Sequence, residues 1–431
     1  MEIGGGASAT PSIDCGGVLS AGTTRRLAIV SRVKTFVLLV FAFSLAALVS
    51  ARFSASLQGT DFPDFYCAAR MLAEGHGHQL YDAELQRQYQ GRYAGRVGTL
   101  YIHPPFEAVV YLALAWLPLR RAYLLWSLLN VAFLTVAARR LTKEALIPWD
   151  WRVLLAASLT FVPMLLCLLQ GQDSWLVLLL VVLAFTALRR DRAFAAGCWL
   201  GLGLFKFQIA LPLVLVLVLT QSRNARRDLG RGFSMVALAL AGLSAAISGW
   251  SVFTVYPGFL LHLQAQPFAG IMPRAMANLR GLIYFFSHSD RSSWAVAAVS
   301  TLSAAALINT LTAWKHARLA PHLSEAIASR DEFDLAFANT VLFALLVSYH
   351  LNPHDLSLLL LPIPLLLHCM LMRTPRFPRV ERWITAGLLG ILFLPPLHLW
   401  TLKAGIYAFV SLPLLALFLT GASLTRQSRT P

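Results

Sequence analysis

Long apolar runs, separated by short polar segments, decide what this chain can fold into. Of its 431 residues, 57% are hydrophobic and only 13% are charged, whereas about a quarter of the residues of a soluble domain are charged. Runs of roughly 15–20 apolar residues have the length of helices that cross a hydrocarbon core about 30 Å thick. A soluble protein of this composition would expose large apolar patches to water. The sequence therefore predicts an all-α, polytopic transmembrane helical bundle.

About twelve runs are predicted to cross the membrane. They cover approximately residues 33–53, 122–138, 152–169, 174–188, 193–205, 207–220, 232–250, 294–314, 335–350, 356–372, 383–400 and 403–421. A further apolar piece, 105–118, is flanked by Pro105 and Pro118 and is short for a crossing. We expect this piece to be re-entrant or to lie along the membrane interface.

The basic residues predict which side of the membrane each segment occupies. The net charge is +16, but Lys and Arg cluster at the ends of the apolar runs, where the positive-inside rule accounts for them. Since no aromatic-rich basic module is present, no nucleic-acid partner is expected. If 105–118 does not cross, the basic segments 139–143, 189–192, 223–231, 315–330 and 373–382 all fall in the cytoplasm.

A single transmembrane domain is expected, with a short segment at each end. Residues 1–32 are rich in Gly, Ala and Ser and are predicted to be a disordered cytoplasmic segment. The transmembrane domain covers 33–421, with large outer loops at 54–104 and 251–293, and 422–431 is a cytoplasmic tail. The run at 33–53 is predicted to be a retained span of an inner (plasma) membrane protein and not a cleaved signal peptide. The five cysteines have no paired spacing, so neither a disulfide framework nor a zinc site is expected.

Polar residues gather in the segments that this topology puts outside. They are Asp61, Asp64, His103, Gln170, Gln172, Asp173, Lys206, Asn278, Arg280, His350, Asn352, His354 and Asp355. Polar groups next to a membrane on one side indicate chemistry at that face.

Two carboxylates, Asp61 and Asp64, follow the first predicted span and open a short helix that Gly75 should end. Either one could simply cap this helix. A carboxylate at the membrane surface could also act as the general base for an acceptor hydroxyl. Farther along, His103 precedes Pro104 and Pro105 and is either a ligand or a structural, interfacial histidine.

A tight turn and a lysine lie within the next apolar region. In Gln170-Gly171-Gln172-Asp173, Gly171 suits a left-handed helix C-cap and Asp173 an N-cap. The two glutamines suit hydrogen bonds to hydroxyls, including those of a sugar. Lys206 lies between two apolar segments, where it either snorkels to the surface or binds a phosphate oxygen.

The turn His350-Leu-Asn352-Pro353-His354-Asp355 invites a metal interpretation. Because Pro353 breaks the helix that would align the two histidines, contact with a phosphate is the better interpretation, and no metal is expected. Arg280, in the second outer loop, could grip phosphate with its guanidinium or be a surface residue.

Taken in order, these segments resemble the family 87 glycosyltransferases of the GT-C class, which include mycobacterial polyprenyl-phosphomannose-dependent α-1,2-mannosyltransferases. The resemblance covers roughly residues 55–370. His103 departs from it, because a tyrosine often precedes the Pro-Pro pair in that family. The matching residues are Asp61-Phe-x-x-Phe-Tyr-x-Ala-Ala-Arg70 with Gly75, Leu80-Tyr81-Asp82, His103-Pro-Pro105 with Trp126 and Asn130, Gly171-Gln172, Ala196-Gly197 to Lys206 ahead of Pro212, Asn278, and His350-x-Asn-Pro-His-Asp355.

The resemblance implies an inverting, metal-independent hexosyltransferase without a cofactor, whose active site is extracytoplasmic. Its partners would be a polyprenyl-phosphate sugar donor, a lipid or glycan acceptor, and membrane lipids. Asp61 matches the catalytic base. The donor phosphate is assigned to Lys206, His350, His354 and Arg280, and the substrates to Asp64, Tyr66, Tyr81, His103, Gln170, Gln172 and Asn278.

Two other functions compete with this one. A transporter or flippase for a lipid-linked or sugar substrate would also use intramembrane charge and glycine-broken helices, but it predicts paired inverted halves that the sequence does not display. A scaffold without chemistry leaves the one-sided polar cluster unexplained.

Overall fold

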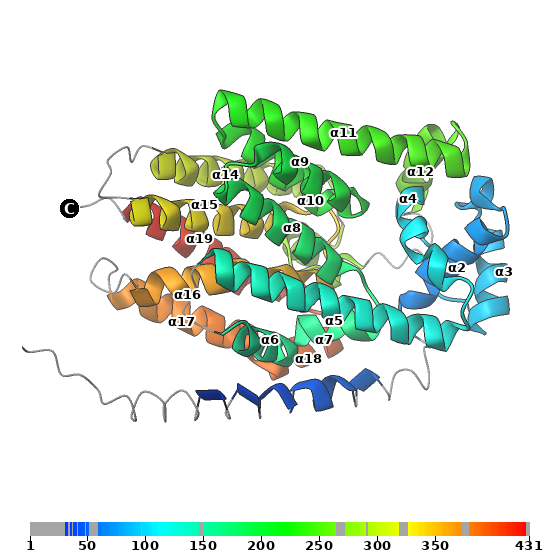
Figure 1. Ribbon diagram of the computed structural model, residues 1–431, viewed down its shortest axis with the longest axis horizontal. Coiled ribbons are helices and arrows are strands. Elements are labelled where there is room, and N and C mark those ends of the chain that lie inside the picture. The colour runs from blue at the N-terminus through cyan, green and yellow to red at the C-terminus, as the bar shows by residue number, and fades with distance from the viewer. Residues whose placement is uncertain are drawn as a thin grey trace, which may run out of the picture.

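A computed structural model gives the fold of this chain (Figure 1). It describes residues 31–32, 35–36, 38–40, 42–47, 49–50, 59–95, 97–145, 150–263, 272–289, 292–318, 326–372 and 379–427. Of the segment expected to be disordered, 1–32, residues 1–30 lie outside the described residues, and so does the end of the expected tail, 428–431. The described part of the first predicted span is helical at residues 38–40 and 42–47.

Short helices form a compact unit at one end of the molecule (Figure 1), where the sequence predicts an outer loop. Aromatic side chains make its core, including Phe62, Phe65 and Tyr111, and Trp126, which follows the unit in the chain, packs against them. The two helices α4 and η2 hold only 4 and 6 residues, too few to cross about 30 Å of hydrocarbon. The unit, named the outer unit below, comprises α2 (Phe62–Ala73), η1 (Gly77–Gln79), α3 (Ala83–Ala94), α4 (Pro105–Ala108) and η2 (Val109–Leu114).

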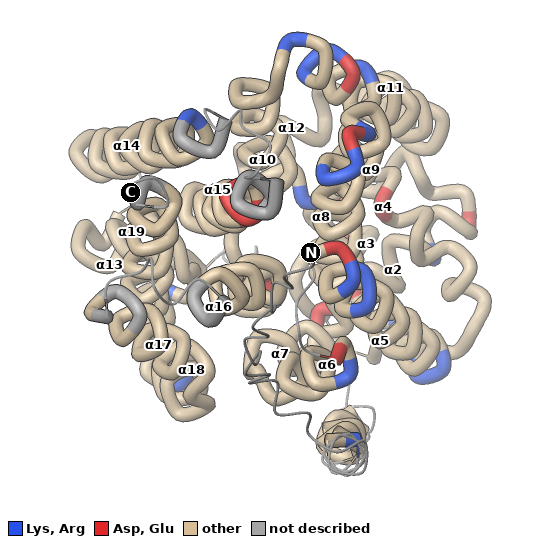
Figure 2. Tube along the Cα trace, turned by 60° about the vertical axis from the view of Figure 1, so that its left-hand side comes forward, with Lys and Arg blue, Asp and Glu red and all other residues tan. Residues whose placement is uncertain are grey.

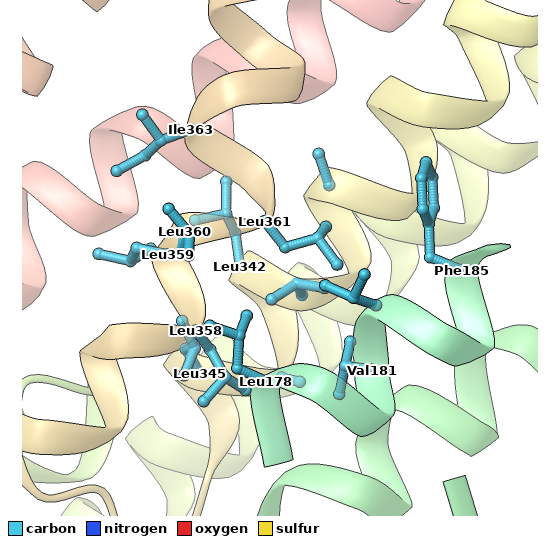
Figure 3. Close-up of a cluster of buried hydrophobic side chains, with 14 of the residues drawn as sticks. Leu178, Val181, Phe185, Leu342, Leu345, Leu358, Leu359, Leu360, Leu361 and Ile363 are labelled. Carbon is cyan, nitrogen blue, oxygen red and sulfur yellow. The ribbon is translucent and has the colours of Figure 1, made fainter. Parts of the chain in front are cut away.

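A bundle of longer helices makes up most of the rest. Leucines of α8, α15 and η6 interdigitate in its centre (Figure 3). The bundle comprises α5 (Leu119–Glu144), α8 (Ser174–Arg189), α9 (Ala193–Leu202), η3 (Gly203–Lys206), α10 (Phe207–Thr220), α11 (Arg223–Ser248), α14 (Ser293–Arg318), α15 (Ala326–Val347), η6 (Pro353–Leu360), α16 (Pro362–Met372), η7 (Tyr407–Val410) and α19 (Ser411–Gln427).

Two predicted spans are broken by proline. α6 (Trp151–Thr160) and α7 (Val162–Gln170) meet at 76°, and the helical stretch that ends at Phe393 meets α18 (Pro395–Lys403) at 56°. Each second helix begins with proline in its first two residues, which removes a backbone donor and disfavours a straight helix. At the second bend the ring of His398 bridges Leu392 O, 2.6 Å from Nε2, and the hydroxyl of Tyr407, 2.8 Å from Nδ1, so it satisfies a carbonyl near the break.

The structure does not confirm twelve spans. Within the described ranges, five helices are long and apolar enough to cross a membrane, or up to seven if each bent pair is one span. Ala193–Thr220 counts as one such stretch. The backbone of Lys206 within it is not helical (φ −111°, ψ 60°). Other predicted spans, such as α8 with 16 residues, form helices that are too short to count among these.

Two predicted connecting segments contain helices. The basic segment 223–231 is the beginning of α11, which starts nine residues before the predicted span at 232. The predicted outer loop 251–293 contains α12 (Val252–Leu263), η4 (Pro273–Ala275) and α13 (Leu279–Ser287). Hydropathy alone missed these helices because charged or proline-containing sequence can still form helical turns.

Basic residues gather at the ends of α5 and α8 and at the start of α11 (Figure 2). Arg189 Nη1 lies 3.4 Å from Asp334 Oδ2, and Arg190 pairs with Glu144. These ion pairs hold the last turns of α5 and α8 and the first turns of α15 at one end of the bundle. From there α8 runs 16 residues back to Ser174, about 24 Å, so Ser174 lies near the opposite end.

Candidate active site

A cavity of about 780 Å³ opens where the outer unit meets the bundle. Polar residues from the sequence-predicted set line it, namely Asp61, Asp64, His103, Gln170, Gln172, Lys206, His350, Asn352, His354 and Asp355. Apolar side chains, including Leu166, Phe205 and Met272, line other parts of the wall. The fold thus brings together residues that are up to about 300 positions apart in the chain.

Both glutamines of the tight turn hold Asp61. Gln172 donates from Nε2 to Asp61 Oδ2 at 2.7 Å, and the Asp61 backbone N–H donates to Gln170 Oε1 at 3.1 Å. Gly171 between them has the predicted left-handed backbone (φ 66°), and a Cβ there would lie 2.6 Å from Cβ of Phe62. Asp61 does precede α2, but its side chain makes no cap hydrogen bond. Its carboxylate therefore belongs to the cavity wall and not to a helix cap.

Asp64 has a different environment. It is 7% exposed and accepts hydrogen bonds from Gln90 Nε2 at 3.0 Å and from the hydroxyl of Thr99. Gln90 also contacts the backbone of Gly98 and Thr99. This carboxylate fastens segment 97–100 to α2, which is a structural function at the edge of the cavity.

Lys206 is the centre of a buried ionic cluster. Its Nζ lies 2.6 Å from Asp355 Oδ1, 3.0 Å from Asp173 Oδ1 and 2.8 Å from Ser174 Oγ. With 2% of its surface exposed, the lysine does not snorkel. An ammonium has three donors, and these three protein oxygens account for them. Asp355 also accepts a hydrogen bond from the backbone N–H of Asn352 at 2.9 Å. Through Asp173, Ser174 and Asp355, Lys206 therefore links its own segment to the start of α8 and to η6.

Three histidines face the cavity. Burial lowers the pKa of His103 and that of His350 to about 4, so both rings are neutral near pH 7. His103 Nδ1 lies 2.7 Å from Glu107 Oε2. Within the part of the chain that the structure describes, His350 Nδ1 and His354 Nε2 have no hydrogen-bond partner. Both residues line the cavity, although these two nitrogens are themselves buried, and His354 Nε2 lies 3.7 Å from Asp355 Oδ1.

Four of the sequence-predicted site residues do not line the cavity. Tyr66 and Tyr81 donate to the carbonyls of Leu117 and His103, each at 2.8 Å. Asn278 caps α13 through Gly281 N and donates to Ser348 O at 2.6 Å. Arg280 stacks 3.9 Å over the ring of Tyr349 and donates to its carbonyl at 2.8 Å. All four position the segments around the cavity.

Sequence reasoning missed Glu107. This residue is 1% exposed and lies four positions after His103, inside the apolar piece 105–118. A carboxylate within an apolar run is costly to bury without a partner, and that signal would have singled it out.

Comparison with known proteins identifies the family. The model of glycosyltransferase family 87 matches residues 101–353, more than half of the chain. No curated protein and no solved structure matches it. Asp61 precedes the matched segment, whereas Lys206, His350 and the turn at Gly171 lie inside it. Together with the helices that can cross a membrane, this match shows that the chain is a membrane protein belonging to glycosyltransferase family 87.

Proposed function

We propose that this protein transfers a hexose, mannose-like in its stereochemistry, from a polyprenyl-phosphate donor to a lipid or glycan acceptor, with inversion. The observation that carries the proposal is the hydrogen bond from Gln172 to Asp61 at the wall of the cavity. It orients a carboxylate in the wall of a cavity that His350 and His354 also line. A base and a phosphate site thus share one cavity.

Asp61 serves as the general base in this mechanism. A hydroxyl is a poor nucleophile, and a carboxylate within hydrogen-bond reach can take its proton as the new bond forms. The acceptor oxygen attacks the anomeric carbon from the face opposite the phosphate. The new C–O bond forms, the bond to the phosphate oxygen breaks, and that oxygen leaves with the electron pair.

His350 and His354 stabilise the departing phosphate as hydrogen-bond donors. Donors aimed at a site of developing negative charge lower the barrier most when they are held in place. Lys206 lends positive potential nearby, but it would have to release one of its three protein partners to contact the phosphate directly. We therefore assign Lys206 first to holding Asp173 and Asp355.

The two ends of the bundle support an extracytoplasmic site. Ser174 accepts a hydrogen bond from Lys206, which lines the cavity. Arg189, at the other end of α8, lies among the basic residues at the ends of α5 and α8. By the positive-inside rule the basic end faces the cytoplasm, so the cavity faces the opposite side. Its apolar wall, which includes Phe205, Phe207 and Leu261, suits the first isoprene units of a lipid donor.

The decisive experiment incubates the purified protein with radiolabelled polyprenyl-phosphate sugars and a lipid acceptor extract. We expect label to move from the donor to a new glycolipid. Asp61→Asn should lower the rate by about 10²–10⁴-fold, the usual contribution of a general base. Asp82→Asn is the matched control, because Asp82 caps α3 in the same outer unit and Asn caps about as well. Full turnover by Asp61→Asn, or no transfer with any donor, would overturn the proposal.

A further inference from the structure

We propose that His103, Glu107 and Asp173 bind a divalent transition-metal ion that holds the outer unit to the bundle. One donor atom from each of these residues lies within 4.8 Å of the others. His103 lies two residues before α4, Glu107 lies within α4, and Asp173 lies in the turn before α8. An ion at this point would join the two parts of the molecule that enclose the cavity.

The charges of the buried cluster call for such a cation. Glu107, Asp173 and Asp355 are each 1% exposed. Lys206 contacts Asp173 and Asp355. When all three carboxylates are ionised, one ammonium leaves two negative charges uncompensated. Uncompensated charge is strongly unfavourable in an apolar interior. A divalent ion balances these two charges.

The carboxylate oxygens that would bind the ion have few other partners. Glu107 and Asp173 face each other as hydrogen-bond partners, and Glu107 Oε2 faces His103 Nδ1. Among the described residues, no further hydrogen bond is made to the Glu107 oxygens or to Asp173 Oδ2. Asp173 Oδ1 faces Lys206, at 3.0 Å. His103 Nδ1 lies 2.7 Å from Glu107 Oε2, which is a hydrogen-bond distance. Ligands with bonds of about 2.0–2.2 Å to a tetrahedral ion lie about 3.3–3.6 Å apart, so this pair would open by less than 1 Å to admit the ion.

The donor set indicates the kind of ion. One imidazole and two carboxylates suit Zn²⁺ or Mn²⁺, whereas Mg²⁺ and Ca²⁺ prefer oxygen ligands alone. His103 has 19% of its side chain exposed toward the cavity, which gives the ion a way in.

The ion has a structural function here. It is not placed at Asp61 or at His350 and His354, so the transfer mechanism contains no metal step. It would fix Asp173 against α4, and with it the neighbouring Gln172, whose amide holds Asp61. Its loss should first lower stability and only secondarily activity.

Metal analysis of the full chain tests the proposal independently of transfer. The protein is purified in detergent without chelators, with Zn²⁺ or Mn²⁺ added and then removed by gel filtration, and its metal content and Tm are measured. We expect about one ion per chain and a lower Tm after chelation that metal restores. Glu107→Gln, which keeps the side-chain shape, should lose the ion and the response to chelator. Glu74→Gln in α2's C-cap should keep both.

The contrary result is equally clear. If the wild-type protein retains no stoichiometric ion and its Tm does not respond to chelator or to added metal, the site is not a metal site. The excess negative charge would then be balanced by a proton shared between Glu107 and Asp173. An ion retained equally by Glu107→Gln would also overturn the proposal.

Discussion

Gln172 donates a hydrogen bond across 2.7 Å to Asp61, although 111 positions separate the two residues in the chain. The contact joins the outer unit to the turn between α7 and α8. It leaves Asp61 oriented by an amide that carries no charge of its own and so does not neutralise the carboxylate. Orientation of the proposed base therefore depends on a residue that the sequence suggested for sugar binding.

Removal of this amide should impair catalysis more than binding. Gln172→Leu keeps much of the side-chain volume but lets the Asp61 carboxylate turn, and misplacement by about 1 Å can cost about a hundredfold in rate. We expect kcat to fall about ten- to a hundredfold while the KM for the donor stays nearly constant. Steady-state transfer assays measure both. An increase in KM with unchanged kcat would instead place Gln172 in contact with substrate.

Lys206 should stabilise the protein through its two ion pairs. Lys206→Met leaves Asp173 and Asp355 buried without their cation, and breaking a buried pair typically costs about 3–5 kcal/mol. We expect a large drop in Tm together with loss of transfer. The double variant Lys206→Met/Asp355→Asn should recover part of the Tm, because it removes one of the stranded charges. A single variant with normal Tm but no donor binding would make Lys206 a phosphate ligand only.

His350 should make stability depend on pH. Burial lowers its pKa to about 4 in the folded protein, against about 6.5 for an unperturbed histidine. Between these values the unfolded chain binds more protons, so stability falls as the pH drops from about 6.5 to 4. His350→Gln should flatten the slope of Tm against pH in that window. His78→Gln, on an exposed histidine, should leave the slope unchanged.

The contact between α9 and α11 should tolerate no side chain at Gly232. A Cβ there would lie 2.1 Å from the carbonyl oxygen of Phe194, so Gly232→Ala must push the helices apart, at a cost of about 1–3 kcal/mol. Gly230→Ala is the matched control two residues earlier, where a Cβ meets nothing within 4 Å. We expect lower Tm and yield for Gly232→Ala alone. Equal thermal unfolding of the two variants would show that the helices separate without cost.

Hydropathy and charge were enough to predict an all-helical membrane protein. Apolar runs fit a hydrocarbon core in only a few ways, and buried backbone must pair its own hydrogen bonds. The residue order Asp61, Gly171-Gln172, Lys206 and His350 also sufficed to indicate the glycosyltransferase family. The left-handed Gly171 was predictable, since its backbone angle is a local property.

The tertiary structure decided how those residues work. Nothing local reveals that Gln170 and Gln172 turn to Asp61, that three protein oxygens surround Lys206, or that Glu107 meets Asp173. Whether a run forms one helix, a bent pair or a 3-10 turn also depends on neighbours, as at the 76° break before α7. Contacts between residues a hundred or more positions apart form only when the helices pack into the bundle. Hydropathy predicts which residues leave water, but it does not predict which residues contact one another.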